Sequence, residues 1–384
     1  YNEKVIQRDY LFSLLRSYIV QDSIKELFNS SGQPHVGHKN VAQVIIPVPR
    51  SSNEQTAIAN ALSDVDNLIA SLETLIAKKS AIKTAAMQQL LTGKKRLPGF
   101  EGKSVKESEK QGAKQSSELD NTSKTAQAAQ IKQTAMLNSD LYKESGEGLD
   151  EKSNQHSDVS NANNKQTAPR PGYKQTELGE IPEGWEVSTV NNVSLVPMQN
   201  GLFYEPQRKG KGVPLINVGD MYTSAPIDVS SLDLFDATES EIKVFKVQKG
   251  DLFFTRSSIV PSGIAYCNTF KEENAVAVFD SHLIRVRPDQ KVMDADFLYL
   301  NCIASHSRRF LISSAKTATM TTIDQGAIKK CPVLVPPLKE QTAIANVLSD
   351  MDTELDALQQ RLSKTQQIKQ GMMQELLTGK TRLV

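Results

Sequence analysis

Three short clusters in the sequence combine cationic side chains with hydroxyl groups, which are the groups that contact nucleic-acid phosphates and base edges. The clusters are Arg208, Lys209 and Lys211; Arg256, Ser257 and Ser258; and Lys316, Thr317, Thr319, Thr321 and Thr322. The first cluster lies in a Gly-flanked loop, and the second follows an apolar stretch typical of a strand. The third lies between an expected helix and an expected strand. Each cluster is therefore a candidate contact with a polyanion.

Each cluster also has a plainer interpretation, which the sequence leaves open. The first cluster could be a solvated loop, and Arg256 could lie buried against a carboxylate. The threonine-rich segment could be a connector that ends in a helix cap. Arg308 and Arg309 are expected on a solvated helix face. His35 and His38 share a polar loop without the further ligands of a metal site, so we expect no metal there.

Charge composition narrows where a polyanion could bind. The chain of 384 residues has 45 Lys and Arg against 44 Asp and Glu, which excludes a histone-like polycation. Residues 173–338 contain 17 cationic and 19 anionic side chains, but residues 243–338 contain 13 and 8. Because phosphate contacts need cations, the later part of this segment is the better candidate face.

Motifs for catalysis are not found in the sequence. There is no phosphate-binding Gly-rich loop, no GxGxxG and no ordered nucleophile–histidine–acid pattern, so we expect no catalytic residues. The spacing of Cys267, Cys302 and Cys331 fits neither a disulfide framework nor a zinc knuckle. A reducing, cytoplasmic compartment is expected. No apolar run approaches the roughly 18 residues of a membrane span, and no signal peptide is evident.

A long internal repeat is the strongest feature of the chain. Residues 54–66 read EQTAIANALSDVD and residues 340–352 read EQTAIANVLSDMD, at an offset of 286. At this offset, 24 of the 44 positions in 54–97 are identical, including the Leu-Leu-Thr-Gly-Lys at 90–94 and 376–380. Two segments of equal length that recur in this way predict two elements that pack against each other.

Each copy of the repeat has the apolar spacing of a long coiled-coil helix. Apolar residues recur at steps of four and three, which gives the 3.5-residue period of a packing seam. The expected seam residues are Ile58, Leu62, Val65, Ile69, Leu72 and Ile76 in the first copy, and Ile344, Leu348, Met351, Leu355, Leu358 and Leu362 in the second. Each helix should span about 38 residues, roughly 57 Å. Gly93 and Gly379 are expected as left-handed C-terminal caps.

The repeat continues upstream of both helices. Residues 9–12 resemble 296–299 and open expected helical segments; each is followed by an expected Val/Ile-rich strand, at 44–46 and 333–335, with a proline-rich exit. Further strands are expected at 213–218, 242–247, 251–255, 275–279 and 282–287, and helices at about 294–313. The fold class is therefore α+β: an irregular α/β domain with two long antiparallel coiled-coil helices.

Five segments follow from these patterns. Residues 98–172 are polar, with Tyr142 as the one aromatic residue in 101–170, and are expected to form a flexible linker with a transient helix near 125–137. The expected divisions are a domain remnant at 1–50, helices at 51–97 and 339–384, this linker, and a complete α/β domain at 173–338.

The combined pattern resembles the specificity subunits of type I restriction-modification systems. The motifs that carry the resemblance are the repeat EQxAIAxxLSDxD…LLTGKxRL, the segment LGEIPEGW at 178–185 and the segment GDLFFTR at 250–256. The resemblance covers all of the chain except the linker. It identifies 173–338 as a target recognition domain and 1–50 as the end of another one.

The resemblance implies the partners and the role of the chain. Each of two recognition domains would read one half of a bipartite site in double-stranded DNA, and the long helices would act as a ruler between them. The helices would also bind methyltransferase subunits, which carry S-adenosylmethionine and methylate adenine N6, and a translocating restriction subunit would join them. The specificity subunit itself would do no chemistry and would hold no cofactor.

This sequence departs from the family pattern in two ways. The first recognition domain lacks about 110 residues at its front, and the linker is unusually long. We therefore expect the sequence to be a natural truncation or a fragment, and expect one copy to read one half-site. Self-association through the quasi-symmetric helices would restore a second reader. A coiled-coil adaptor without DNA specificity and an inactive fragment stay as alternatives.

Overall fold

In the computed structural model, the described residues are 4–26, 42–101, 169–223 and 225–383. They divide into two compact units, one formed by Tyr1–Ala81 with Met351–Val384 and the other by Ile82–Asp350. We refer to these as unit 1 and unit 2. The histidine-containing loop at 30–38 and the expected helix near 125–137 lie outside the described residues, and so does most of the expected linker. The domain boundaries stay predictions.

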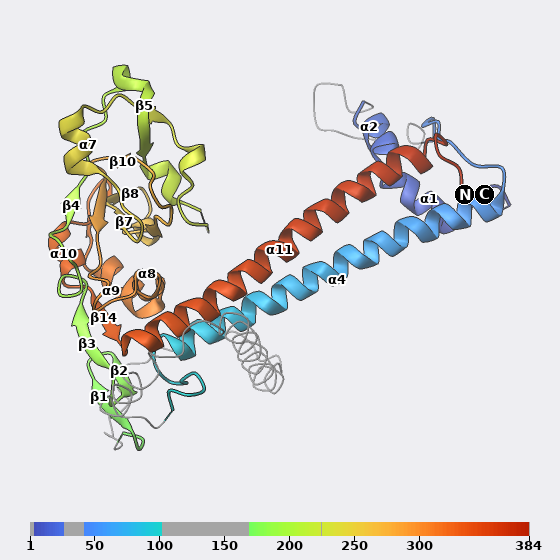
Figure 1. The fold of residues 1–384 in the computed structure, drawn as a ribbon. Coiled ribbons are helices and arrows are strands. Elements are labelled where there is room, and N and C mark those ends of the chain that lie inside the picture. The colour runs from blue at the N-terminus through green and yellow to red at the C-terminus, as the bar shows by residue number, and fades with distance from the viewer. Residues whose placement is uncertain (1–3, 27–41, 102–168, 224, 384) are drawn as a thin grey trace, which may run out of the picture. The chain divides into compact units, whose positions relative to one another are not determined.

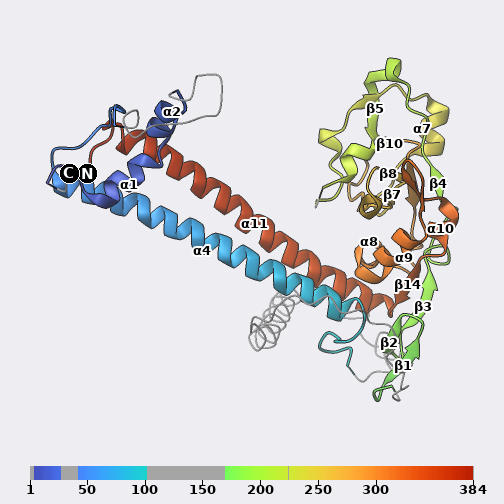
Figure 2. The same cartoon turned by 180° about the vertical axis from the view of Figure 1, so that it is seen from behind.

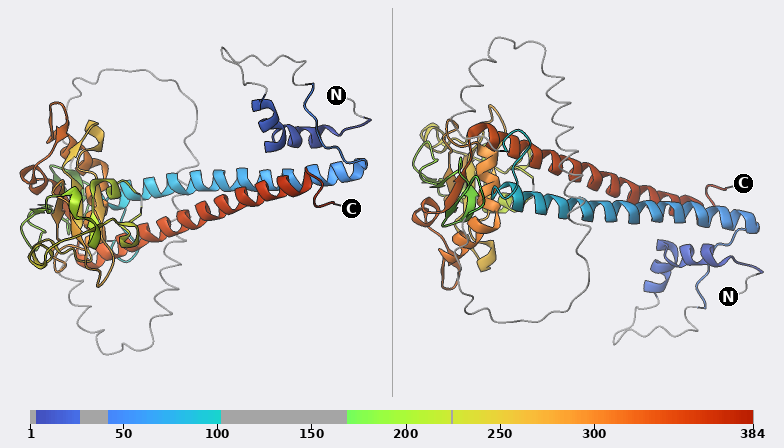
Figure 3. Two further views of the ribbon diagram at one scale, coloured as in Figure 1. Left: turned by 90° about the horizontal axis from the view of Figure 1, so that it is seen from above. Right: turned by 90° about the horizontal axis from the view of Figure 1, so that it is seen from below.

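The two copies of the repeat form helices of equal length, as predicted. Helix α4 (Ser52–Leu90) and helix α11 (Leu338–Leu376) each contain 39 residues and lie side by side (Figure 3). Within unit 1 the carboxylate of Asp66 lies 2.5 Å from Lys369 Nζ, and Lys79 Nζ lies 2.9 Å from Glu354. As the residue number on α4 rises, the number of its partner on α11 falls, so the two helices are antiparallel.

The expected seam residues lie on the least exposed face of their helices. Six are buried: Ile58, Leu62, Leu72, Ile344, Leu348 and Met351. The other six are half-buried: Val65, Ile69, Ile76, Leu355, Leu358 and Leu362. The burial therefore follows the 3.5-residue period, and the cover over the middle of each helix is less complete than at its N-terminal end.

Both long helices end in the same left-handed glycine cap, as predicted. Gly93 has φ +68° and Gly379 has φ +75°. The amide of Lys95 donates to the carbonyl of Gln89 at 3.2 Å, and the amide of Thr381 donates to the carbonyl of Glu375 at 3.1 Å. Each of these hydrogen bonds joins an amide to the carbonyl six residues earlier, and it satisfies a carbonyl that the end of the helix leaves without a partner.

Unit 1 places two short helices near the beginning of α4 and the end of α11. Helix α1 (Arg8–Leu15) and helix α2 (Tyr18–Glu26) confirm the expected helical opening. Their core combines side chains from the N-terminus and both long helices: Ile6, Tyr10, Leu14, Val20, Ile58, Ala59, Leu62, Leu376 and Leu377. Burial of the Tyr10 phenol, with the Glu54 carboxylate nearby, raises the pKa of Tyr10 to about 12.

The strand expected at 44–46 is wrong, because residues 44–49 adopt no regular secondary structure. The corresponding segment of unit 2 does form strand β14 (Pro332–Val335), and β14 pairs with β3 (Glu186–Thr189). A strand needs a partner for its backbone groups, and no described residue of unit 1 offers the pairing that β3 provides.

Unit 2 contains several small sheets in an irregular α/β arrangement, which confirms the expected fold class. The sheets run in the orders β1-β2, β14-β3, β10-β5-β6, β4-β11-β7-β9 and β12-β13-β8. The strands are β1 (Tyr173–Thr176), β2 (Gly179–Pro182), β4 (Gln199–Asn200), β5 (Lys209–Ile216), β6 (Leu234–Phe235), β7 (Leu252–Thr255), β8 (Ser257–Ser258), β9 (Cys267–Thr269), β10 (Val278–Phe279), β11 (Leu283–Val286), β12 (Lys316–Thr317) and β13 (Thr321–Thr322). The main core packs aromatic side chains between these sheets, with Phe253 and Phe279 ring centroids 5.1 Å apart.

The expected strand at 242–247 is wrong, since these residues belong mainly to helix α7 (Glu239–Phe245). A capping box begins this helix. The amide of Glu241 donates to Thr238 Oγ1 at 3.2 Å, and the Glu241 carboxylate accepts from the Thr238 amide at 2.7 Å. This local cap outweighs the alternating apolar pattern. The strands expected at 213–218, 251–255 and 282–287 are confirmed as β5, β7 and β11, and the one at 275–279 is reduced to β10.

Helices α8 (Ala295–Ile303) and α9 (Ser305–Ser313) confirm the helices expected at 294–313, and a short helix α10 (Gln325–Lys329) follows.

The two units also share equivalent hydrogen bonds. In unit 1 the Gln55 side chain donates to the carbonyls of Val5 and Pro49, and in unit 2 Gln341 donates to those of Val292 and Pro336. No helix among the described residues is both long and apolar enough to cross a membrane.

Candidate nucleic-acid interface

Two of the three predicted clusters meet in the small sheet β12-β13-β8 of unit 2. Ser258 pairs with Thr321 and Ser257 with Thr322 across β8 and β13. Strand β13 in turn pairs with β12, so that Lys316 lies opposite Thr322 and Thr317 lies opposite Thr321. Segments that are about 60 residues apart in the chain thus form one surface, which we call the hydroxyl sheet. Its strand β8 is labelled in Figure 1 and Figure 2.

The side chains of the hydroxyl sheet divide into an exposed set and a buried set, with Ser257 half-buried between them. The exposed set consists of Arg256, Lys316, Thr317, Thr319 and Thr322. Ser258 and Thr321 are buried and support the sheet, since Thr321 Oγ1 lies 3.2 Å from Thr317 Oγ1 and Ser258 Oγ accepts from the Val260 amide. No ion pair joins Arg256 or Lys316 to another residue in the part of the chain that the structure describes. Their charges are therefore available to a ligand.

Arg256 is held by backbone bonds between two sheets. It directly follows β7, and its amide donates to the carbonyl of His282 at 2.9 Å. Its carbonyl accepts from the Ile323 amide at 3.0 Å, which ties it to the strand end after β13. The backbone from which the guanidinium extends is therefore fixed in position, and base reading by a side chain requires such a fixed support.

The Gly250-Asp251 pair before β7 has a structural role. Asp251 is fully buried and forms a two-pronged ion pair with Arg287, with both N–O distances 2.7 Å. It also accepts from the Gln248 amide at 2.8 Å. A Cβ on Gly250, which has φ +87°, would meet the Ala295 methyl at 3.2 Å. These contacts anchor the strand that presents Arg256.

Exposed apolar residues border the hydroxyl sheet, and the sequence analysis did not identify them. Ile259 is 86% exposed, Val260 is 56% exposed and Met320 is 45% exposed. Exposed apolar side chains next to cationic ones can contact thymine methyl groups or insert between neighbouring base pairs. The signal in the sequence is an Ile-Val pair between Arg-Ser-Ser and Pro261, where a solvent-exposed loop would normally be polar.

Arg308 supports the loop that carries these apolar residues. It is half-buried, and its guanidinium donates to the carbonyl of Ala265 at 2.6 Å and that of Ser262 at 2.9 Å. Burial lowers the pKa of Arg308. The solvated helix face expected for this residue is therefore wrong, and only Arg309 is exposed as expected.

The first predicted cluster lies on a different sheet and is paired with acids. Arg208 forms ion pairs with Glu241 and with Glu205, and its guanidinium lies over the Phe235 ring at 4.5 Å. Lys209 lies 2.6 Å from Asp233, and Lys211 lies 2.9 Å from Asp236. The structure does not bring this cluster into the hydroxyl sheet, and its charges are already balanced.

The Arg208–Glu241 pair predicts a pH-dependent contribution to stability. Hydrogen bonds from Arg208, and then from the Thr238 amide, lower the pKa of Glu241 from 4.5 to about 2. The pair therefore stabilises the folded state above about pH 4.5, and this stabilisation is lost as the pH falls through about 2. We expect the free energy of unfolding of the wild type and of Glu241→Gln to converge over that interval. Gln keeps the capping box, so curves that stay parallel would contradict this role.

The three cysteines lie near one another in unit 2 and are all buried. The pKa of Cys302 is raised by its hydrogen bond with Cys267 and by burial, and burial raises the pKa of Cys331. Such thiols are poor nucleophiles and poor metal ligands. Within the described ranges, no group of three His, Cys, Asp or Glu side chains is arranged to hold a metal.

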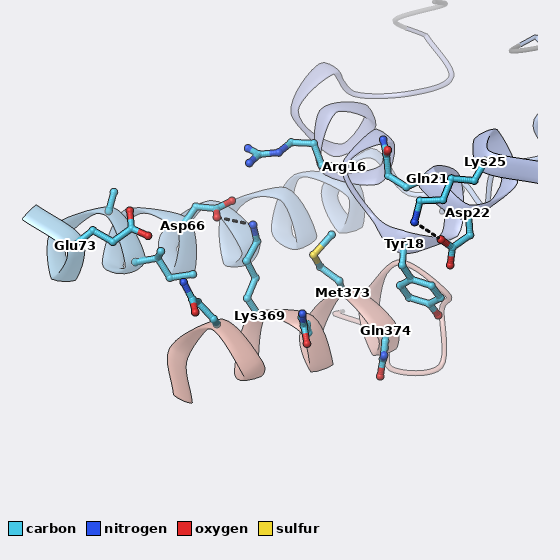
Figure 4. A pocket seen from close by; sticks show the side chains of 14 residues that line it. Arg16, Tyr18, Gln21, Asp22, Lys25, Asp66, Glu73, Lys369, Met373 and Gln374 are labelled. Atoms are coloured by element: carbon cyan, nitrogen blue, oxygen red, sulfur yellow. Dashed lines mark hydrogen bonds and ion pairs between the residues drawn. The ribbon is translucent and has the colours of Figure 1, made fainter. Parts of the chain in front are cut away.

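Unit 1 contains an open groove of about 970 Å³ between α2 and the two long helices (Figure 4). Its wall carries Asp22, Asp66 and Glu73 beside Arg16, Lys25 and Lys369, so its charges balance. The Asp66–Lys369 and Lys25–Asp22 ion pairs use most of them internally. This mixture offers no cationic surface for a phosphate backbone.

A comparison with protein families identifies the group to which these features belong. The model for the "Type I restriction modification DNA specificity domain" matches residues 2–80 and 182–370, which is more than half of the chain. The chain belongs to this family. The family match covers both long helices in large part and nearly all of the α/β domain, including the hydroxyl sheet.

Similar proteins include several type I specificity subunits. The chain is 25% identical over 217 residues to the putative MjaX specificity subunit of Methanocaldococcus jannaschii, covering 54% of this chain and 48% of that subunit. It is 24% identical over 171 residues to the EcoKI specificity subunit of Escherichia coli, covering 44% and 36%. The match thus spans about half or less of these two relatives. It is 20% identical to the MjaVIII specificity subunit of M. jannaschii, covering 99% of this chain and 72% of that subunit.

Solved structures share the fold. The S subunit of a type I restriction-modification system from M. genitalium has a TM-score of 0.51 at 12% identity, over 98% of this chain and 74% of that one. A chain from a structural study of complex assembly and conformational transition in a type I system has a TM-score of 0.50 at 12% identity, over 98% and 72%. At these identities the likeness concerns the fold alone.

Proposed function

We propose that this specificity-domain protein recognises a short sequence in double-stranded DNA through the hydroxyl sheet of unit 2. It would act as the non-catalytic reader of a type I restriction-modification complex. Its long helices would bind methyltransferase subunits, which hold S-adenosylmethionine, and a restriction subunit would complete the assembly. One copy would read one half of a bipartite site through its single described α/β domain.

The supporting observation is the meeting of two distant polar clusters in one exposed sheet. Arg256 and Lys316 lie on this surface without an acidic partner among the described residues, and three threonines surround them. Cations contact phosphates, and arginine reads guanine through two parallel hydrogen bonds. The adjacent exposed apolar residues add the apolar part of a base-reading surface. An adaptor without DNA specificity would need none of these features.

Selection from a pool of random duplexes tests the proposal. The chain, in complex with its methyltransferase subunit, is expected to enrich a short motif, and discrimination at each contacted base pair is expected to be about 1–3 kcal/mol. Binding should weaken steeply as salt increases, because binding releases counterions from the DNA and this release becomes less favourable at higher salt. Salt-sensitive binding without an enriched motif would contradict sequence reading, and absence of binding would support the adaptor alternative.

A further inference from the structure

One face of the hydroxyl sheet carries a row of polar side chains. Successive residues of a strand point to opposite faces of a sheet, and residues that pair across two strands share a face. Lys316 lies opposite Thr322, and Thr322 lies opposite Ser257, so these three side chains share one face. We call them the polar row. Lys316 and Thr322 are exposed and Ser257 is half-buried, so this face is open to a ligand.

An apolar row follows the polar row on the same face. Thr321 pairs with Ser258, and both side chains are buried. The next two residues in this register, Met320 and Ile259, return to the open face just beyond the strand ends. Ile259 is 86% exposed and Met320 is 45% exposed. The change from exposed to buried to exposed along both strands matches the two-residue period, so we call Ile259 and Met320 the apolar row.

The backbone that carries Ile259 is fixed by the loop that follows it. The turn at 261–263 folds back on β8, where a Cβ on Gly263 would lie 2.6 Å from Ser258 Oγ. The amide of Ala265 donates to the carbonyl of Thr255 at 3.1 Å, which attaches the end of the loop to β7. Arg308 donates to two carbonyls of the same loop. Ile259 therefore extends from a support that is held from three sides.

The chemistry of the two rows points to one base. Among the base edges of a duplex, thymine presents an apolar group, its C5 methyl, which an apolar side chain can contact. Residues two positions apart on a strand are separated by about 6.6 Å, and base pairs are stacked about 3.4 Å apart. A strand that follows the groove would thus place the apolar row about two base pairs from the polar row.

We propose that Ile259 and Met320 read the C5 methyl group of a thymine, and that Arg308 is the positioning residue that holds Ile259 against it. The contact distinguishes thymine from cytosine, which has no such methyl group. This inference rests on the proposed function, because it assigns one base within the site that the hydroxyl sheet recognises.

Replacing thymine by uracil tests the proposal, because uracil lacks the methyl group and keeps the pairing with adenine. Each thymine of the selected motif is replaced in turn, and binding of the complex with the methyltransferase subunit is measured by fluorescence anisotropy. We expect the affinity of the wild type to fall about fourfold at one thymine, the effect of one buried methyl group. Ile259→Ala should weaken binding to the thymine duplex and should bind the uracil duplex equally well.

Two further variants separate the methyl contact from other effects. Leu195 is 59% exposed and lies outside the hydroxyl sheet, so Leu195→Ala should keep the fourfold preference for thymine. Arg308→Lys keeps the charge but cannot reach both loop carbonyls as the guanidinium does. It should reduce the preference for thymine and leave the salt dependence of binding unchanged. Circular dichroism checks that each variant is folded.

The outcomes distinguish this inference from the proposed function. Absence of any enriched motif would overturn both. An enriched motif that contains no A·T pair, or one that tolerates uracil at every position, would overturn the thymine contact and leave sequence reading in place. A uracil effect that persists in Ile259→Ala would also overturn it, since another group would then contact the methyl. Equal weakening of both duplexes by Leu195→Ala and Ile259→Ala would do the same.

Discussion

Replacing Arg256 and Lys316 together by alanine is expected to abolish most sequence-specific DNA binding while leaving the fold intact. Both side chains are exposed and form no ion pair with another described residue, so their removal leaves no buried charge. If both contact the duplex, affinity for the selected motif should fall by about 10- to 100-fold. If both contacts are to phosphates, the slope of log affinity against log salt should decrease by about 1.8.

The two single variants distinguish base reading from phosphate contact. Loss of a base contact at Arg256 should lower the ratio of specific to non-specific affinity. The corresponding loss of discrimination free energy is about 1–3 kcal/mol at one base pair. Loss of a phosphate contact should weaken all duplexes alike and decrease the salt slope by about 0.9. Arg256→Lys is expected to retain the phosphate effect and to lose the base discrimination, because lysine lacks the planar fork of arginine.

The control for these variants is Lys243→Ala. Lys243 is exposed on α7, which is not part of the hydroxyl sheet, so this change removes from unit 2 the same single charge as each single variant. Binding should be measured by fluorescence anisotropy at several salt concentrations, against the selected motif and a scrambled duplex. If Lys243→Ala weakens specific binding as much as Arg256→Ala or Lys316→Ala does, the hydroxyl sheet is not the reading surface.

Replacing Glu340 by alanine is expected to destabilise unit 2 by about 3–5 kcal/mol, the usual effect of breaking a buried ion pair. Glu340 is fully buried, and Arg96 is 11% exposed. The change leaves the Arg96 guanidinium and the Trp185 indole without their acceptor. Hairpin β1-β2 should loosen as well, because Trp185 attaches it to the helix ends.

The equivalent variant in unit 1, Glu54→Ala, provides an internal control. Its partner Arg382 is 66% exposed and can be hydrated, so we expect a smaller loss of stability than for Glu340→Ala. The one tryptophan of the chain lies in unit 2, so its fluorescence during urea unfolding reports on that unit. Circular dichroism reports on both units. Equal shifts of the tryptophan transition in the two variants would contradict the role of Glu340.

Local periodicity was enough to predict the long helices and their ends. The four-and-three spacing of Ile58, Leu62 and Leu72 reflects contact along a single face, which a linear sequence records directly. Gly93 and Gly379 could be assigned as caps because few other residues adopt a positive φ there. The prediction of a strand at 242–247 was wrong, because the alternation of apolar and polar residues there is short and the capping box at Thr238 favours a helix.

Pairing between distant segments decided what the sequence left open. The sequence contains the Arg256 and Lys316 clusters, but only the hydrogen bonds of β8, β13 and β12 place them together. The sequence left Arg208 as a candidate phosphate contact, but the structure pairs it with Glu241, which lies 33 residues further along the chain, as well as with its neighbour Glu205. Side-chain partners of this kind depend on non-local packing, which no local pattern encodes.

The sequence by itself determined the family, the two equal helices and the residues that repeat between them. It also contained the identical Glu54 and Glu340, and the identical Arg96 and Arg382, without showing that they pair across the repeat. Only the tertiary structure decided that one pair lies under Trp185 while the other is uncovered among the described residues. The physical reason is that burial depends on what covers a group, and the cover comes from a hairpin far away in the chain.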